Sequence, residues 1–361
     1  PGALIQDTYF RRQATSTLNG VQCSEFSAAV LVTVDNFSPG VISTDQTICE
    51  GDTPAAFTSV AAAGDFTSVA YQWYESTDNI TYNLIAGATA ETYAPGALIQ
   101  DMWYKREATA TLNGVDCIEE TAPVRVTVNN FDPGSIGSDQ TICENTTPVA
   151  LTSVTPTGDG SFTYRWFSST DNTTFNPIPG AISETYSPGL LTQDMWYYRE
   201  VTSTLNGKAC IEVTNTVQVT VNNFTPGSIE DDQTICEGDT PAAITSLVAA
   251  TGDGALTYQW KESVNGIAFT DIAGATAETY APGALTQDTW YKRETTSTLN
   301  GTPCSEETNV VLITVINFIP GSIGSDQTIC EGTAPTTFTS VASSGDGVKS
   351  YQWQDSPDGV T

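Results

Sequence analysis

The sequence contains no histidine. Histidine is the most frequent general base and a common metal ligand in proteins, so its absence removes the usual catalytic triad and most zinc sites. Carboxylates paired at Glu119-Glu120 and Glu306-Glu307 are replaced by Ile211-Glu212 at the matching position, so no acidic pair is kept throughout. We therefore expect no enzymatic activity and no cofactor.

Basic residues are scarce as well. The chain has 12 Lys and Arg against 42 Asp and Glu, which gives a net charge of -30. Nucleic-acid binding needs a basic surface, so this balance predicts that nucleic acid is not a partner. No apolar run approaches the 18 residues that a membrane helix needs, so we expect no membrane insertion. The acidity favours a soluble chain kept extended by self-repulsion.

Calcium binding is an alternative use of the acidic residues. Asp132 and Asp139 flank one boundary between repeated segments, and clustered oxygen ligands suit this hard cation. In the other segments, however, Asp132 is replaced by Ser38, Thr225 and Ile319. A calcium site is therefore not reproduced along the chain, and we expect no bound metal while keeping calcium as the alternative.

A repeated motif organises the whole sequence. The six residues Asp-Gln-Thr-Ile-Cys-Glu occur four times, at spacings of 94, 93 and 94 residues. A unit of this length can form one small domain with its own core, so the period predicts tandem domains within a longer protein. The expected division is the C-terminal part of a repeat at 1–36, complete repeats at 37–129, 130–222 and 223–316, and the N-terminal part of a repeat at 317–361.

Within one unit, the pattern indicates strands only. A Tyr and a Trp stay two positions apart in every copy, as at Tyr71 and Trp73, while the next residue varies, so the pair is expected to face inward. Asn113-Gly114 predicts a tight hairpin after a strand at 103–112, with its return strand at 124–128. About seven short strands, with a Trp on the third, predict an all-β fold of immunoglobulin-like sandwiches. The predicted core tryptophans are Trp73, Trp166, Trp260 and Trp353.

Two cysteines recur in each unit, which predicts disulfides and an extracellular setting. The eight candidates are Cys23, Cys49, Cys117, Cys143, Cys210, Cys236, Cys304 and Cys330. Cys49 and Cys117 are expected at opposite ends of their domain, too far apart for a bond. The favoured scheme joins Cys49 to Cys210 and Cys143 to Cys304 across domain boundaries. The other four cysteines would then pair outside this segment or stay unpaired. Bonds of the type Cys49–Cys117 or Cys117–Cys143 remain open as alternatives.

Four motifs together resemble a known group of repeats. They are Ile48-Cys49-Glu50-Gly51, Tyr71-Gln72-Trp73, the segment from Gly87 to Leu98, and Trp103-Tyr104-Lys105-Arg106. They are similar to the immunoglobulin-like or PKD-like repeats of giant Bacteroidetes surface proteins, including gliding-motility adhesins exported by the type IX route. The resemblance implies a cell-surface location and a stalk or adhesin role, and it transfers no catalytic residue.

We therefore expect a structural stalk segment of a very long cell-surface adhesin filament, serving surface attachment or gliding motility. Its partners would be the neighbouring repeats of the same chain and, through regions outside this segment, an extracellular surface or polysaccharide. The alternative is that the repeats themselves bind polysaccharide weakly and multivalently. That alternative predicts exposed aromatic side chains at one end of every unit.

Overall fold

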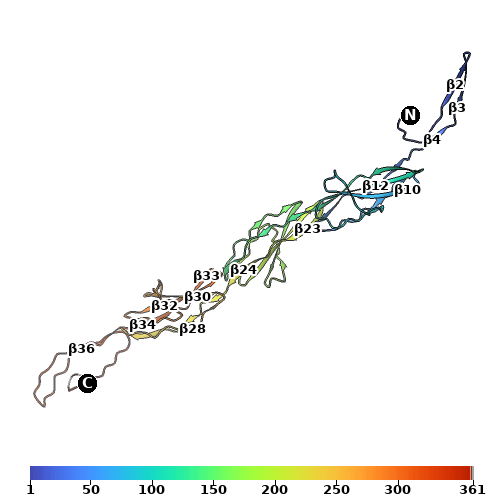
Figure 1. Cartoon of the computed structure of the whole chain (residues 1–361). Coiled ribbons are helices and arrows are strands. Elements are labelled where there is room, and N and C mark those ends of the chain that lie inside the picture. Colours follow the sequence, from blue (N-terminus) through green and yellow to red (C-terminus); the bar gives the residue numbers. More distant parts are fainter. Residues whose placement is uncertain (358, 360–361) are drawn as a thin grey trace.

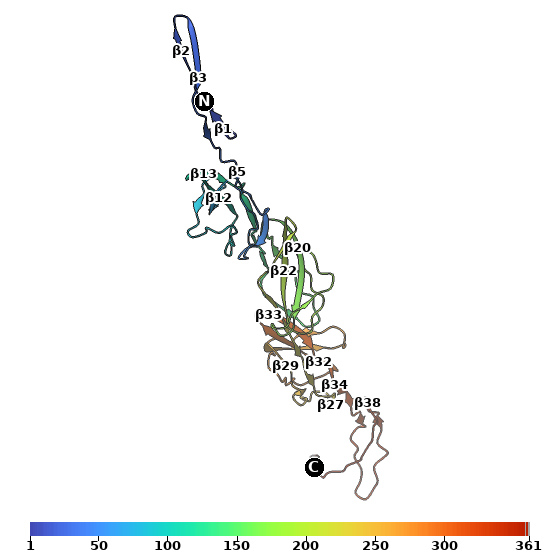
Figure 2. The same ribbon diagram turned by 90° about the vertical axis from the view of Figure 1, so that its right-hand side faces the viewer.

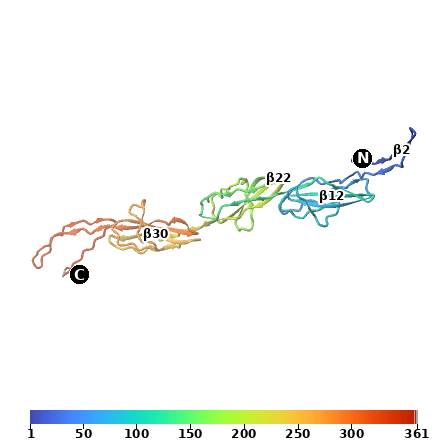
Figure 3. The ribbon, with the colours of Figure 1, turned by 45° about the horizontal axis from the view of Figure 1, so that its top comes forward.

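The computed structural model describes residues 1–357 and 359, and it contains strands and no helix within them. No described helix could therefore cross a membrane. Three sandwich domains follow one another end to end, with the N- and C-terminal segments at opposite ends of an elongated rod (Figures 1, 2 and 3). We call the domains repeat 1, repeat 2 and repeat 3; their strands run from β5 to β14, β15 to β24 and β25 to β34.

Repeat 1 sets the pattern for the other two. Its strands are β5 (Phe37–Ser38), β6 (Val41–Ile42), β7 (Gln46–Cys49), β8 (Ser59–Val60), β9 (Ala63–Gly64), β10 (Ser68–Ser76), β11 (Asn83–Leu84), β12 (Met102–Leu112), β13 (Val115–Glu120) and β14 (Val124–Asn129). The large sheet has the order β11-β10-β12-β14-β7, with β13 also paired to β12. The small pairs β5-β9 and β6-β8 lie outside that sheet.

Repeats 2 and 3 have the same topology. Repeat 2 consists of β15 (Phe131–Asp132), β16 (Ser135–Ile136), β17 (Gln140–Cys143), β18 (Ser153–Val154), β19 (Thr157–Gly158), β20 (Ser161–Ser169), β21 (Asn176–Pro177), β22 (Met195–Leu205), β23 (Lys208–Val213) and β24 (Val217–Asn222). Repeat 3 consists of β25 (Phe224–Thr225), β26 (Ser228–Ile229), β27 (Gln233–Cys236), β28 (Ser246–Val248), β29 (Thr251–Gly252), β30 (Ala255–Ser263), β31 (Thr270–Asp271), β32 (Thr289–Leu299), β33 (Thr302–Glu307) and β34 (Val311–Ile316).

The two end segments carry only part of this pattern. The N-terminal segment has β1 (Thr8–Phe10), β2 (Gln13–Leu18), β3 (Val21–Phe26) and β4 (Val30–Val32). The C-terminal segment has β35 (Phe318–Ile319), β36 (Ser322–Ile323), β37 (Ser340–Val341) and β38 (Ser344–Gly345).

The core of each repeat forms around its tryptophan. Trp73 has no exposed surface, stacks on Phe57 with ring centroids 5.7 Å apart, and donates its indole N–H to the carbonyl of Ala90 at 2.9 Å. Val126 and Val128 on β14 and Tyr104 on β12 enclose it. The fold class predicted from the sequence, tandem immunoglobulin-like sandwiches, is confirmed.

Trp166 and Trp260 are buried in the same way, but the prediction for Trp353 is wrong. Trp353 is 62% exposed. The side chains that enclose Trp73, such as Tyr104 and Val126, come from later in the repeat, and no counterparts follow Trp353 within the 361 residues.

The hairpin prediction needs one correction. Asn113 and Gly114 both have positive φ, at 51° and 78°, as a two-residue turn of this kind requires. The return strand, however, is β13 and not the predicted strand at 124–128. Pro123 separates the two, and β14 instead pairs antiparallel with the start of β12 and parallel with β7. The far half of β12 thus pairs with β13 on one side and with β10 on the other, and β13 takes the place that β14 holds beside the start of β12.

Candidate functional site: the junctions between repeats

The polypeptide passes from one repeat to the next with almost no linker. Only Asn130 separates β14 of repeat 1 from β15 of repeat 2, and only Asn223 separates β24 from β25. The carbonyl of Asn130 accepts a hydrogen bond from the Asp159 N–H at 2.9 Å. The linker is therefore part of the folded structure of the following repeat.

Gly158 allows this close approach. Its φ is 126°, and a Cβ added there would lie 2.4 Å from the carbonyl oxygen of Asn130 and 2.6 Å from Cα of Phe131. Glycine is the residue that tolerates both the positive φ and the contact. Phe131 then packs against Phe162 of its own repeat, with ring centroids 5.9 Å apart.

The hairpin of the following repeat also reaches back across the junction. Its turn, Asn206-Gly207 between β22 and β23, lies beside β7 of repeat 1. The side-chain amide of Asn206 donates to the hydroxyl of Thr47 at 3.2 Å, and Lys208 forms an ion pair with Asp52 at 3.5 Å. At the next junction Asn300 makes the same bond to Thr141, at 3.1 Å. The same turn therefore docks at both junctions.

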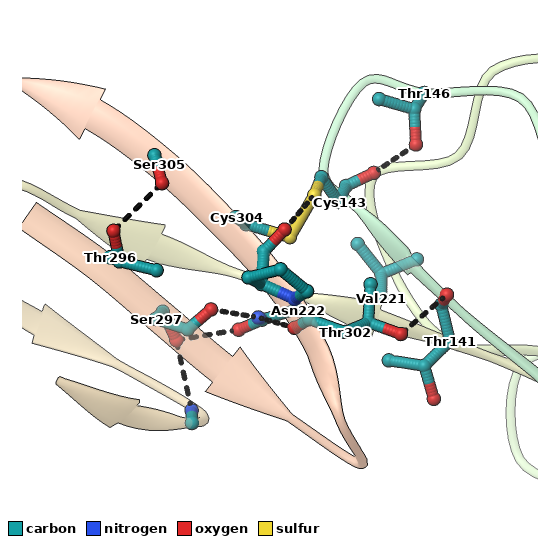
Figure 4. Close-up of a disulfide and its surroundings, with 12 residues drawn as sticks. Thr141, Cys143, Thr146, Val221, Asn222, Thr296, Ser297, Thr302, Cys304 and Ser305 are labelled. Atoms are coloured by element: carbon teal, nitrogen blue, oxygen red, sulfur yellow. Dashed lines mark hydrogen bonds between the residues drawn. A yellow bond between two sulfur atoms is a disulfide. The ribbon is translucent and has the colours of Figure 1, made fainter. Parts of the chain in front are cut away.

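A disulfide fastens each of these contacts. Cys49 is bonded to Cys210 and Cys143 to Cys304, each pair with Cα atoms 5.6 Å apart. Figure 4 shows the second of these bonds. These are the two bonds of the staggered scheme that the sequence favoured. The in-repeat alternative Cys49–Cys117 and the Cys117–Cys143 alternative do not form.

The other four of the eight candidate disulfide cysteines form no bond, which is one of the two outcomes that the staggered scheme allowed for them. Cys23, Cys117, Cys236 and Cys330 are unpaired in the structure. The physical reason is the stagger, because each bond joins a cysteine of one repeat to the hairpin cysteine of the following one. None of the four has such a partner among the described residues.

A buried polar pair, which the sequence did not reveal, lies next to each disulfide. Asn129 and Ser203 are at most 1% exposed; Asn129 donates to the Ser203 carbonyl at 3.1 Å, and the Ser203 hydroxyl donates to the Asn129 side-chain oxygen at 2.9 Å. Asn222 and Ser297 form the same pair at 2.9 and 2.8 Å (Figure 4). The signal in the sequence is that both members change together, because Asp35 and Ala110 stand at the equivalent positions one repeat earlier.

A buried arginine holds the start of each repeat to its core. Arg106 has no exposed surface; its guanidinium donates to the carbonyls of Pro39 and Glu91 at 2.7 and 2.6 Å and lies 4.3 Å from the centre of the Tyr71 ring. Burial lowers the pKa of this guanidinium below its usual value. None of the ion pairs in the described part of the chain involves it. Arg199 and Arg293 occupy the same place in repeats 2 and 3.

Sequence comparison between the repeats could have found this arginine. The position before it varies among Arg11, Lys105, Tyr198 and Lys292, whereas Arg12, Arg106, Arg199 and Arg293 are the same residue type. An arginine that stays fixed beside a variable position on a strand points inward, because successive side chains face opposite sides.

The aspartates near the junctions have structural partners. Asp139 accepts a hydrogen bond from the backbone of Gln218 at 2.8 Å, and Asp132 accepts one from the backbone of Gly134 at 2.8 Å. Among the described residues, no group of three or more acidic or cysteine side chains has the arrangement of a metal site. These carboxylates cap strands and turns.

Comparison with known proteins gives one family. A sequence profile described as a domain of unknown function, DUF8696, matches residues 38–130, 132–223, 225–317 and 319–361. The chain belongs to this family. Four DUF8696 matches in tandem account for nearly all of its length. No curated protein matches the sequence.

Several solved structures of tandem domains resemble the chain. The first three domains of the outer capsid protein Hoc of bacteriophage RB49 are 14% identical, with a TM-score of 0.38, over 78% of this chain and 99% of that one. The titin I-band fragment I67–I69 is 11% identical, with a TM-score of 0.41, over 77% and 99%. The insect immune protein hemolin is 11% identical, with a TM-score of 0.25, over 80% and 79%.

Proposed function

We propose that this chain is a stalk segment of a long cell-surface adhesin, which holds a binding region away from the cell for attachment or gliding. The main support for this proposal is that neighbouring repeats are joined at two points. A linker of one residue and a disulfide join each pair of repeats, so the rod cannot bend freely at its junctions.

The covalent chemistry supports an extracellular location for this role. Disulfides persist in oxidising compartments and are rare in the cytosol, and tandem immunoglobulin-like repeats suit an extended structural or adhesion-type protein. The high negative charge disfavours collapse of the rod onto itself or onto neighbouring copies.

The surface argues for the stalk over polysaccharide binding by the repeats. Tyr198 lies between Phe167 and Phe175 on repeat 2, with ring centroids 4.9 and 4.8 Å apart. Repeats 1 and 3 carry Lys105 and Lys292 at the position of Tyr198. Repeat 1 keeps Tyr74 and Tyr82 against Lys105, and repeat 3 keeps only Phe269, against Lys292. The aromatic surface thus differs from repeat to repeat, whereas multivalent binding would need the same surface in each.

Deletion within the native protein tests the proposal. Cells expressing the protein without repeat 2 and cells expressing it with a duplicated repeat 2 are compared with wild type for adhesion under flow. A stalk predicts that adhesion changes with length and that the shortened protein still binds a soluble form of its target. Loss of soluble binding after deletion would show that the repeat itself is the binding module.

A further inference from the structure

Each disulfide crosses its junction beside the polypeptide backbone. Cys49 lies opposite Asn129 in the register of the parallel pair β7-β14, and Cys143 lies opposite Asn222 in β17-β24. Adjacent strands are about 4.8 Å apart, so the segment from Cys49 to Asn129 begins and ends at neighbouring points. Most of repeat 1 is folded within that segment.

In repeat 3 too, the folded segment begins and ends at a single junction, the one with repeat 2. The Asn222 side chain, at the point where the backbone enters repeat 3, donates to the carbonyl of Thr302 at 3.4 Å. Thr302 is two residues before Cys304, whose disulfide also enters from repeat 2 (Figure 4). The segment from Asn223 to Cys304 therefore starts and finishes at one junction.

Three segments connect the two disulfides to each other. Residues 49–143 contain the fold of repeat 1, residues 143–210 contain most of repeat 2, and residues 210–304 contain most of repeat 3. All three run between the same two bonds, so they are connected in parallel. The two disulfides can move apart only if every segment lengthens.

We propose that the staggered disulfides place the three folded repeats in parallel under tension, so that none of them can unfold singly when the chain is pulled. Tension that enters at Phe37 follows residues 37–49 to the first disulfide, where it divides among the three segments. It leaves through the second disulfide and residues 304–316. This property concerns the connectivity of this chain and does not depend on its role as an adhesin.

The connectivity also limits extension. With both disulfides intact, the shortest covalent path from Phe37 to Asn317 follows residues 37–49, 143–210 and 304–317, roughly 90 residues or about 320 Å when fully stretched. Without the disulfides the path is the whole of residues 37–317, roughly 280 residues or about 950 Å. Most of the backbone between Phe37 and Asn317 therefore cannot be fully extended while both disulfides are intact.

Single-molecule stretching through tags at the two chain ends tests the proposal. All proteins carry serine at the four unpaired cysteines to prevent cross-linking. With the disulfides intact, no step of the size of one repeat is expected. With reductant, three separate steps are expected, each on the order of 300 Å.

Matched variants locate the effect. In Cys49→Ser/Cys210→Ser the second bond still encloses residues 143–304, so we expect one full step, from repeat 1 alone. In Cys143→Ser/Cys304→Ser we expect one full step, from repeat 3 alone. Full-size single steps in the oxidised parent protein, or three steps in either variant, would overturn the proposal.

A cleavage test checks the same connectivity without force. A protease site is inserted between Gly189 and Leu190, which are exposed. Because this position lies inside both disulfide loops, residues 49–210 and 143–304, the cut oxidised chain should stay one species on a denaturing gel and divide in two only on reduction. Separation of the cut halves without reductant would contradict the parallel arrangement.

Discussion

Asn129 and Ser203 donate hydrogen bonds to each other across the first junction, and both side chains are buried between two domains. The side-chain amide of Asn129 donates to the backbone carbonyl of Ser203, and the side-chain oxygen of Asn129 accepts from the Ser203 hydroxyl. A buried polar group without a partner is costly, so the pair makes the interface specific for correctly docked repeats.

Removal of one member should therefore cost more than removal of both. We expect Asn129→Ala to destabilise the junction by about 1–3 kcal/mol because the Ser203 carbonyl loses its side-chain donor and the Ser203 hydroxyl keeps only the Asp159 carbonyl as an acceptor. Asn129→Ala/Ser203→Ala should be less destabilised than the sum of the single variants. Chemical denaturation of the four proteins measures the coupling, and simple additivity would contradict a direct interaction.

Loss of the first disulfide should loosen the rod without unfolding its domains, because no disulfide lies inside a core. Cys49→Ser/Cys210→Ser should keep the circular dichroism of the parent protein. Small-angle scattering should show a shorter maximum dimension, since the first junction then bends. An unchanged scattering profile would mean that the one-residue linker and the polar contacts fix the angle by themselves.

The buried arginine should not tolerate lysine. Lys lacks the planar group with which Arg106 reaches the carbonyls of Pro39 and Glu91, so Arg106→Lys leaves buried acceptors unpaired. We expect a loss of about 3 kcal/mol and a fall of more than 10 °C in the Tm of that repeat. The exposed Arg165→Lys serves as the control in the same calorimetric measurement, and equal effects would count against the assigned role.

A methyl group at Gly158 should disturb the junction. Gly158→Ala forces a side chain toward the Asn130 carbonyl at a positive φ, and we expect about 2–4 kcal/mol of destabilisation. Gly189→Ala is the control, because it has open space around the added atom. Proteolysis rates near the linker report the change. A linker equally protected in both variants would show that the close approach is not needed.

Stability should fall at alkaline pH. Burial raises the pKa of Tyr197 to about 12, above its ordinary value of 10. A group whose pKa is higher in the folded state stabilises that state below the unfolded pKa, and this contribution is lost as pH rises from about 10 to 12. Each such tyrosine contributes a slope of about 1.4 kcal/mol per pH unit in that range. Tyr197→Phe should flatten the curve of unfolding free energy against pH for repeat 2, and an unchanged slope would contradict this origin.

Much of this molecule was determined by local sequence. The fixed Tyr-x-Trp spacing placed Trp73 inward, because side chains alternate along a strand. Asn113-Gly114 specified the hairpin turn, because few other residues adopt positive φ at both positions. The expected placement of Cys49 and Cys117 at opposite ends of the repeat favoured bonds between repeats over an in-repeat bond, through the distance that a disulfide can span.

The tertiary structure decided what depends on distant partners. Strand β14 pairs with β7 and not with the hairpin. No local sequence pattern predicts this pairing, because it joins segments about 80 residues apart. Trp73 is buried by Tyr104 and Val126, which come from later strands of its repeat, so its burial depends on partners that no neighbouring residue reveals. Asn129 and Ser203 are ordinary polar residues in sequence, and they meet only where two domains dock. Periodicity and turn chemistry act within a few residues and are readable in the chain, whereas a junction exists only after two complete cores have formed.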